Sequence, residues 1–236
     1  MKRRLFNTVF LTTSLTLWAT VMMADHHEEG FVSIFNGQDL TTWDGSPKFW
    51  SVRDGAITGQ TTKENPTRGN TFIIWRGGKV KNFELRLQYR IVGGNSGIQY
   101  RSKDHGNWVV GGYQGDFEAG TRFSGILYDE KGRGILADRG QMTAIATDGG
   151  KHKVEVIGSL GDSDEIQTVI KNEEWNDYKI IASENRFVHM INGRVTVISV
   201  DNDAPRREDS GILALQLHAG PPMTVQFKDI RIKELK

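Results

Sequence analysis

Three short stretches of the sequence place side chains that can bind or react two residues apart. They are Gln99 with Arg101, Gln114 with Asp116 and Glu118, and Gln216 with His218. Successive side chains on a β-strand point to opposite faces, so residues two apart share a face. Each stretch alone would fit an ordinary solvated strand. Together they supply the donors and acceptors that sugar hydroxyls require, so we expect them to converge on one concave sheet face.

The central stretch runs from Gly111 to Gly134 and is rich in glycine. Within it, residues 113–118 alternate strictly between aromatic or small side chains and polar ones, as a strand would. Glycines on both sides let the backbone bend and let a ligand approach closely. We interpret this stretch as the floor of a binding site.

The elements that must position these residues are mostly short strands. Residues 83–91 alternate between apolar and polar or charged side chains, which predicts a strand with one buried face and one solvent-exposed face. Asp54-Gly55 and Asn192-Gly193 are typical of tight hairpins. The one convincing helix is expected over Asp162–Lys171, capped by Asp162 or Ser163. This pattern predicts a single all-β domain, a sandwich or barrel.

The N-terminus has the features of a secretory signal peptide. A basic start, an apolar stretch from Leu5 to Met23 and Ala24 precede an abrupt acidic change. We expect a signal peptide over 1–24, a flexible N-terminus over 25–30 and the folded domain over 31–236, secreted or periplasmic in a bacterium. The alternative is a membrane anchor, because the apolar run approaches the ~18 residues that a span needs.

Composition excludes several classes of function. The chain has no cysteine, which rules out disulfides and a thiol nucleophile. Its 30 basic and 29 acidic residues give no basic surface for nucleic acid or an anionic membrane. No spacing matches a zinc, EF-hand or phosphate-loop site, so no cofactor is expected, although a structural calcium ion is left open. We predict that His152 and His189 lie on strand surfaces. Oligomeric state does not follow from the sequence.

An ordered set of motifs covers nearly the whole chain. It comprises Phe35-Asn36-Gly37-Gln38-Asp39-Leu40 with Trp43, Trp50 with Asp54-Gly55, Asn95-Ser96-Gly97-Ile98 with Arg101, Gly112-Tyr113-Gln114 with Asp116, Glu173 with Trp175, Asn176 and Tyr178, Asn192-Gly193, and Gly211-Ile212 with Leu215-Gln216 and His218. Residues 127–134 (LYDEKGRG) add a further motif. Through these motifs, Gly30 to Lys236 resembles the 3-keto-disaccharide hydrolase-like family. The resemblance implies a concanavalin A-like jelly-roll sandwich of two antiparallel sheets with one short helix, in which one concave sheet carries the site. It also implies cleavage of glycosides already oxidised to a ketone at C3.

A ketone at C3 makes the C2 hydrogen acidic, so the C1 substituent can leave by elimination before water adds. This chemistry needs a base, a stabiliser for the enolate oxygen and an acid for the leaving group. The candidates are His218 or Asp116 as the base, Arg101 with Gln99 as the stabiliser, Glu118 or Tyr128 as the acid, and Gln114 and Gln216 as groups that orient hydroxyls. The expected partner is therefore an oxidised oligosaccharide or glycoside.

Two other functions remain open from the sequence. The first is a non-catalytic carbohydrate-binding module, because one fold serves many functions. The second is a structural or adhesive secreted domain. The supply of Arg, Asp, Glu and His on the same strands favours an enzyme over a lectin.

Overall fold

The structure is a computed structural model in which residues 29–236 are described. The predicted signal peptide and most of the predicted flexible N-terminus lie outside these residues. Within the described range, none of the helices has the length and apolarity that a membrane crossing requires.

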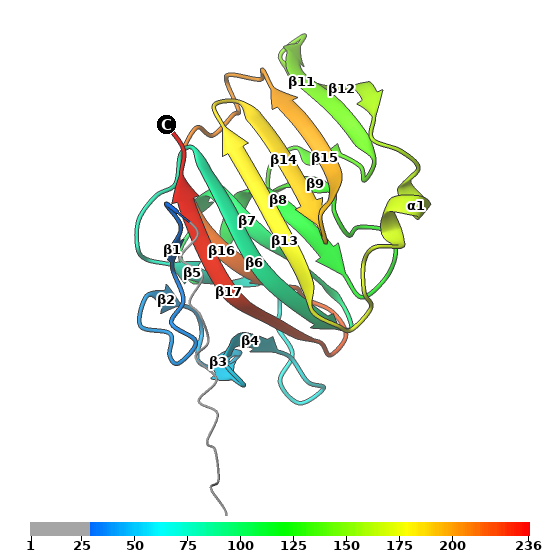
Figure 1. The fold of residues 1–236 in the computed structure, drawn as a ribbon. Coiled ribbons are helices and arrows are strands. Elements are labelled where there is room, and N and C mark those ends of the chain that lie inside the picture. Colours follow the sequence, from blue (N-terminus) through cyan, green and yellow to red (C-terminus); the bar gives the residue numbers. More distant parts are fainter. Residues whose placement is uncertain (1–28) are drawn as a thin grey trace, which may run out of the picture.

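Two large sheets face each other and form a jelly-roll β-sandwich, as predicted (Figure 1). In the described part of the chain, the ten-stranded sheet contains, in spatial order, β12 (Lys151–Ser159), β11 (Gln141–Asp148), β15 (Arg194–Asp201), β14 (Arg186–Ile191), β13 (Asn176–Ser183), β6 (Phe83–Val92), β17 (Thr224–Glu234), β4 (Ala56–Gln60) and β3 (Trp50–Arg53), with β1 (Val32–Ser33) paired to β17. The seven-stranded sheet contains β10 (Gly134–Ala137), β9 (Leu127–Glu130), β8 (Val110–Glu118), β7 (Asn95–Asp104), β16 (Ile212–Leu217), β5 (Thr71–Trp75) and β2 (Trp43–Asp44).

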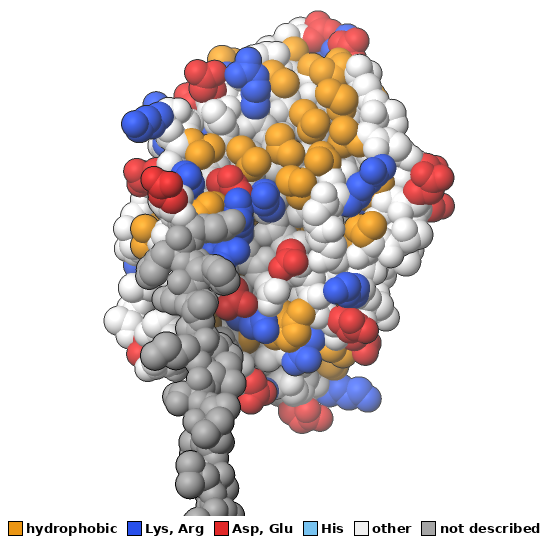
Figure 2. Space-filling model, in the orientation of Figure 1, with side chains coloured by type: hydrophobic (Ala, Val, Ile, Leu, Met, Phe, Trp, Pro, Cys, Tyr) orange, Lys and Arg blue, Asp and Glu red, His pale blue; other side chains and the backbone are white. Residues whose placement is uncertain are grey.

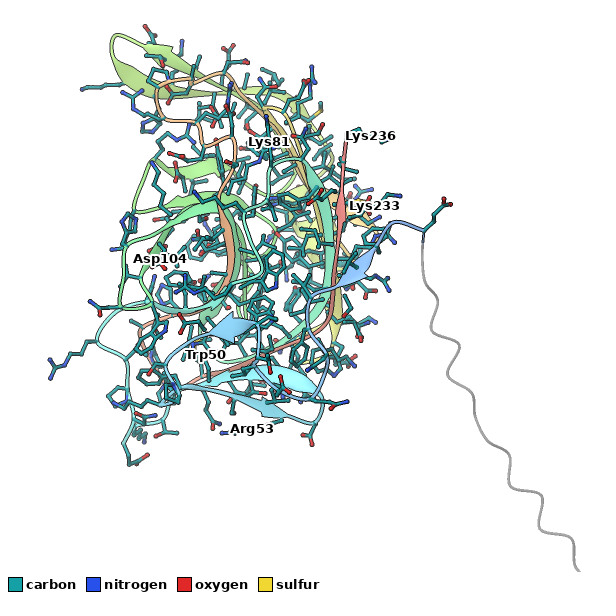
Figure 3. All side chains as sticks on the ribbon, turned by 90° about the vertical axis from the view of Figure 1, so that its left-hand side faces the viewer. Trp50, Arg53, Lys81, Asp104, Lys233 and Lys236 are labelled. Atoms are coloured by element: carbon teal, nitrogen blue, oxygen red, sulfur yellow. The ribbon has the colours of Figure 1, made fainter. Side chains whose placement is uncertain are left out.

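The core lies between the two sheets, where side chains fill the space (Figure 3). On β6, Phe83, Leu85 and Leu87 are almost fully buried, whereas the charged residues between them are half-buried on the opposite face. On β16, the leucines face the same core. Burying such a side chain contributes about 1.5–3 kcal/mol relative to leaving it exposed. The alternation in the sequence therefore assigns the inner face of both strands correctly.

The strands between residues 118 and 162 were not predicted. β9 and β10 have only four residues each, and β12 is an edge strand whose side chains are largely exposed. None of these three needs a regular apolar face, and β11 has only two buried residues, Thr143 and Ile145, so periodicity gives a weak signal in all four strands. Val156 and Ile157 are both more than half exposed on β12. Figure 2 shows an apolar area toward the end of the ten-stranded sheet that carries β11 and β12.

Three further expectations need correction. Helix α1 spans only Ser163–Gln167, although Asp162 caps it as predicted by accepting bonds from the Asp164 and Glu165 amides. The sheets are not purely antiparallel, because β11 and β15 pair in parallel. His189 is fully buried, with Nε2 3.0 Å from the Tyr100 hydroxyl, and burial lowers its pKa to about 3.

Candidate active site

The turn between β7 and β8 curls over the outer face of the seven-stranded sheet. The Phe72 amide donates to the Trp108 carbonyl (3.0 Å), and Trp108 Nε1 donates to Asp44 Oδ1 (2.8 Å). Trp108 belongs to the turn, whereas Phe72 and Asp44 lie on β5 and β2 at the far edge of the sheet. A small second apolar cluster beneath the curl contains Phe72, Ile74, Val110 and Ala214. The curl makes this face concave and buries the polar residues on it.

A relay of amides crosses the concave face. Gln99 lies directly opposite Gln114, and Gln114 lies opposite Tyr128, so the three share a face. Gln99 Nε2 donates to Gln114 Oε1 (2.6 Å), and Gln114 Nε2 donates to Asp116 Oδ1 (2.5 Å). Gly97 leaves room for this relay, because a Cβ there would lie 2.4 Å from Gln114 Cδ. The relay fixes the orientation of the Asp116 carboxyl.

Gln216 is the unsatisfied member of this face. It is fully buried, and neither its amide oxygen nor its amide nitrogen has a hydrogen-bond partner among the described residues. Leu215 pairs with Ile98, so Gln216 lies beside Gly97, which in turn pairs with Asp116. A buried polar group without a partner costs about 1–3 kcal/mol. A ligand that offers both a donor and an acceptor would remove this cost.

Asp116 has an unusual protonation equilibrium for a carboxyl group. Its side chain is only 6% exposed, and burial raises its pKa to about 8. The negative charges of Glu130 and Glu118 add to this effect, while hydrogen bonds from Gln114 and Asn95 oppose it. Burial, followed by Glu130 and Asp116, also raises the pKa of Tyr128. Asp116 can therefore gain or lose a proton close to neutral pH.

Two residues of the site were missed by the sequence analysis. Asn70 Nδ2 donates to Glu130 Oε1 (3.4 Å), and the Ala219 amide donates to Asn70 Oδ1 (3.0 Å). Glu130 shares a strand face with Tyr128, because the two residues are two apart on β9. The alternation in the sequence could therefore have placed Glu130 on the same face as Tyr128. No sequence pattern could have indicated Asn70, because it reaches Glu130 only through the curl of the sheet.

Arg101 does not share the face of Gln99, so the predicted pairing of these two side chains is wrong. The register of β7 shifts between Tyr100 and Lys103, and Arg101 has φ +47°, which turns its side chain away from the concave face. Its guanidinium donates to the Lys81 carbonyl (2.6 Å), the Glu184 carbonyl (2.6 Å) and Asn82 Oδ1 (3.3 Å). Arg101 is fully buried and ties the two sheets together.

The two remaining candidates lie at the margins of the concave face. Glu118 is half-buried at the end of β8, and its carboxylate accepts bonds from the Arg122 and Phe123 amides (2.6 and 3.0 Å). His218 is half-buried just after β16, with Nδ1 2.5 Å from the Ala219 carbonyl oxygen. A carbonyl only accepts, so Nδ1 carries the proton and Nε2 keeps its lone pair in the neutral ring.

The structure thus brings five predicted residues together and separates three from them. Gln99, Gln114, Asp116, Tyr128 and Gln216 share the concave face. Among the residues that the structure describes, no group of three or more His, Cys, Asp or Glu side chains is placed to hold a metal ion. A jelly roll with a concave face lined by amides and a carboxyl fits the class of carbohydrate-related proteins.

The chain belongs to the family of the 3-keto-alpha-glucoside-1,2-lyase-like domain, whose model matches residues 30–233. This membership confirms the resemblance in the sequence and supports a carbohydrate-related function. A comparison with proteins of curated function gave no match.

Solved structures of related architecture include both enzymes and binding modules. The chain is similar to an inferred glycosyl hydrolase from Parabacteroides distasonis ATCC 8503, with a TM-score of 0.58 and 20% identity over 88% of this chain and 95% of that one. It is also similar to the carbohydrate-binding module CBM66 from Bacillus subtilis, with a TM-score of 0.54 and 15% identity over 82% of this chain and 96% of that one. At these identities the likeness shows the fold alone.

Proposed function

We propose that this protein is an exported enzyme that cleaves glycosides carrying a ketone at C3. The observation that carries the proposal is Asp116, a buried carboxyl whose pKa of about 8 suits proton transfer near neutral pH. The family to which the chain belongs supports the same chemistry, because the ketone is what makes a C2 proton removable by a carboxylate.

The first step is removal of the C2 proton by ionised Asp116. The electron pair of the C2–H bond moves to form the enolate, and the C3 oxygen becomes negative. The Gln216 amide nitrogen, which has no partner among the described residues, is free to donate to this oxygen. Gln216 thus takes the role that the sequence suggested for Arg101. A donor of this kind typically contributes ~10²–10³-fold to turnover.

The second step is loss of the C1 substituent, which leaves a C1=C2 double bond conjugated with the ketone. The departing oxygen takes a proton, and Tyr128 is the better placed of the two predicted acids. It lies opposite Gln114 on the concave face, whereas the Glu118 carboxylate is held by two backbone amides. Addition of water to C1 then completes the hydrolysis. His218, with a free Nε2, is the alternative base.

The activity can be tested with a methyl glucoside and its 3-keto derivative. The purified protein should release methanol from the ketone and leave the parent glycoside intact, and substrate carrying deuterium at C2 should react more slowly. Equal turnover of the two sugars would contradict the elimination mechanism.

The second candidate is a carbohydrate-binding module without catalysis. A neutral Asp116 and the unpartnered Gln216 amide would also hold sugar hydroxyls without any reaction. Saturable binding of the 3-keto sugar without product would favour this function over the enzyme.

A further inference from the structure

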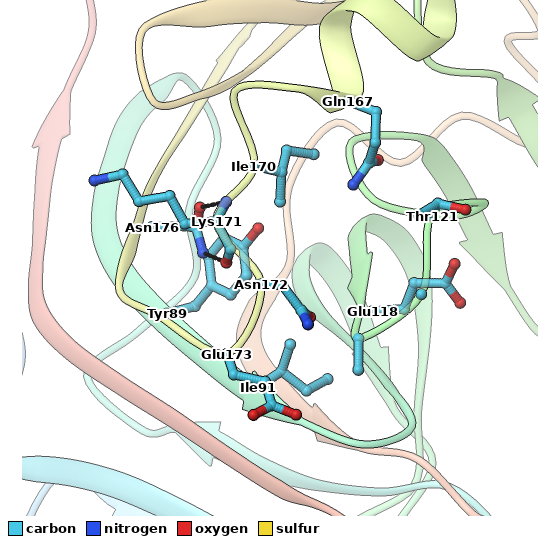
Figure 4. Close-up of a pocket in the computed structure, with 12 residues that line it drawn as sticks. Tyr89, Ile91, Glu118, Thr121, Gln167, Ile170, Lys171, Asn172, Glu173 and Asn176 are labelled. Atoms are coloured by element: carbon cyan, nitrogen blue, oxygen red, sulfur yellow. Dashed lines mark hydrogen bonds between the residues drawn. The ribbon is translucent and has the colours of Figure 1, made fainter.

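A cavity lies at the end of β8, on the core side of β6. It has a volume of about 210 Å³ and lies between the end of β8, the inner side of β6 and the connection from α1 to β13 (Figure 4). Tyr89 and Ile91 form its floor, and both belong to the core side of β6. We call this cavity the rim pocket.

Two polar atoms at the rim pocket have no partner among the described residues. They are the Tyr89 hydroxyl and Gln167 Oε1, and both are buried. The Tyr89 ring is fixed by the Phe117 ring, with centroids 3.9 Å apart, and burial raises the pKa of its hydroxyl. The Tyr89 hydroxyl can both donate and accept a hydrogen bond, whereas Gln167 Oε1 can only accept one. The pair therefore fits a ligand that carries hydroxyl groups.

The loop that forms the wall of the rim pocket opposite β8 is held by side-chain hydrogen bonds. Asn176 Nδ2 donates to the Lys171 carbonyl (2.8 Å), and the Lys171 amide donates to Asn176 Oδ1 (2.8 Å), as the dashed lines in Figure 4 show. Asn192 Nδ2 also donates to Asn176 Oδ1 (2.7 Å). This bonding orders the loop that carries Asn172 and Glu173.

The charges around the rim pocket select against anions. Glu118, Glu173 and Lys171 line it, which places two negative charges and one positive charge near the cavity. Ile91, Ile170 and Ala119 supply apolar contacts for the carbon face of a ring. The volume is below the ~300–1,000 Å³ of pockets for drug-sized molecules, which limits the occupant to about one ring.

From these features we propose that the rim pocket is a non-catalytic binding site for a single neutral sugar unit. The Tyr89 hydroxyl and Gln167 Oε1 hold two of its hydroxyls, and the isoleucines contact its ring. This site does not depend on the proposed function. Its nearest link to the concave face is Glu118, which lies two residues beyond Asp116 on β8.

The test uses D-glucose as the probe and the δ1 methyl signals of Ile91 and Ile170 as the readout in NMR titrations. Both signals should shift and saturate at ~millimolar glucose, as expected for a small weak ligand. Tyr89→Phe and Gln167→Leu each remove one unpartnered atom, and each should weaken binding ~10-fold, equivalent to about 1.4 kcal/mol. Because those atoms make no bond within the described protein, both variants should stay folded.

Two controls separate this site from its surroundings. Tyr100→Phe removes a buried hydroxyl that is bonded to His189 outside the rim pocket, so glucose binding should not change. Asp116→Asn should stop cleavage of 3-keto substrates but keep the methyl shifts, which distinguishes the two proposals.

Three results would overturn the inference. The first is the absence of methyl shifts at ~100 mM glucose, far above a millimolar dissociation constant. The second is unchanged affinity in both Tyr89→Phe and Gln167→Leu. The third is equal binding of D-glucuronate, because Glu118 and Glu173 should repel its carboxylate.

Discussion

Two buried polar clusters of this molecule differ in how completely their groups are paired. The first surrounds Arg133, which is 4% exposed and follows β9. Its Nε donates to Asp129 (2.7 Å), and its Nη1 donates to Asp201 (2.8 Å). The Tyr113 hydroxyl donates to Asp201 (2.5 Å), and Asp203 is bonded to Thr147 and Arg206. The cluster connects the β9–β10 turn to the end of β15 and leaves no charge unpaired among these residues.

The second cluster, on the concave face, is incomplete. Gln216 has no partner for either end of its amide among the described residues, and Asp116 receives amide hydrogen bonds but pairs with no described cation. Natural proteins rarely leave buried polar groups unsatisfied. A closed cluster stabilises the fold, whereas an open one with a strongly shifted pKa indicates a site for a ligand.

The largest expected effect is on activity, at the open cluster. Asp116→Asn removes the proposed base while keeping the shape and neutrality of the protonated side chain. Turnover of a 3-keto glucoside should fall by ~10²–10⁴-fold, the usual contribution of a general base. The unfolding midpoint in urea at acidic pH should change little.

Asp177→Asn is the matched control for this variant. Asp177 is exposed on β13, which belongs to the ten-stranded sheet, and accepts a bond from Gln88. It should keep full activity. If both variants were equally active, the base would be another residue, and His218→Ala would be the next variant to measure.

At the closed cluster the effect should be on stability. Arg133→Met leaves Asp129 and Asp201 buried without their cation, which typically costs ~3–5 kcal/mol. Arg186→Met is the control, because its pair with Glu184 is exposed and should be worth less than about 1 kcal/mol. Urea unfolding of both variants measures the difference. Similar midpoints would mean that the closed cluster does not support the fold.

Alternation within a strand was enough to predict from the sequence which side chains face the core and which lie on the opposite face. Tyr113 and Phe117 face the core and Gln114 and Asp116 face the site, as period two requires. The alternation on β16 assigned Gln216 to the site in the same way. These assignments need no knowledge of which strands pair.

The sequence could not predict what depends on breaks in alternation or on distant contacts. Arg101 is displaced by a bulge, and such a bulge changes the face of a residue without changing its neighbours in sequence. Arg133 and Asp201 meet only because two sheets are packed together. Asn70 meets Glu130 only because the sheet curls. None of these contacts leaves a periodic signal.

The stability and the activity that depend on Asp116 in the open cluster should change with pH. The folded-state pKa of Asp116 is raised to about 8 from an ordinary 3.8. Its contribution to stability is therefore complete below about pH 4 and is lost as pH rises through 8. Activity should change in the opposite direction, rising with pH to a plateau above about 8, because the base must be ionised.

Urea unfolding of the native protein and of Asp116→Asn at ~pH 6 and ~pH 9 checks the effect on stability. The native protein should lose more stability between these values than the variant does. The same loss in both proteins would show that Asp116 is not the group that titrates.

The smallest expected effect on stability is at Gln216. Gln216→Leu removes an amide that has no partner among the described residues and places an apolar side chain beside Phe72 and Ala214. Stability should stay the same or rise by up to about 1 kcal/mol, because replacing an unsatisfied polar group with an apolar one removes a desolvation cost. Turnover of the 3-keto substrate should nevertheless fall ~10²-fold if the amide donates to the enolate.

Gln99→Leu is the matched control, because Gln99 sits on the same face but is fully bonded. Its loss leaves Gln114 Oε1 without its donor, while the Ser102 hydroxyl keeps the Tyr100 carbonyl as an acceptor, so stability should fall by about 1–3 kcal/mol. The stability changes of Gln216→Leu and Gln99→Leu should thus differ in sign or size, although the same substitution is made on the same sheet face. Equal losses of stability would mean that the Gln216 amide is satisfied in solution, and the open cluster would then be as closed as the one around Arg133.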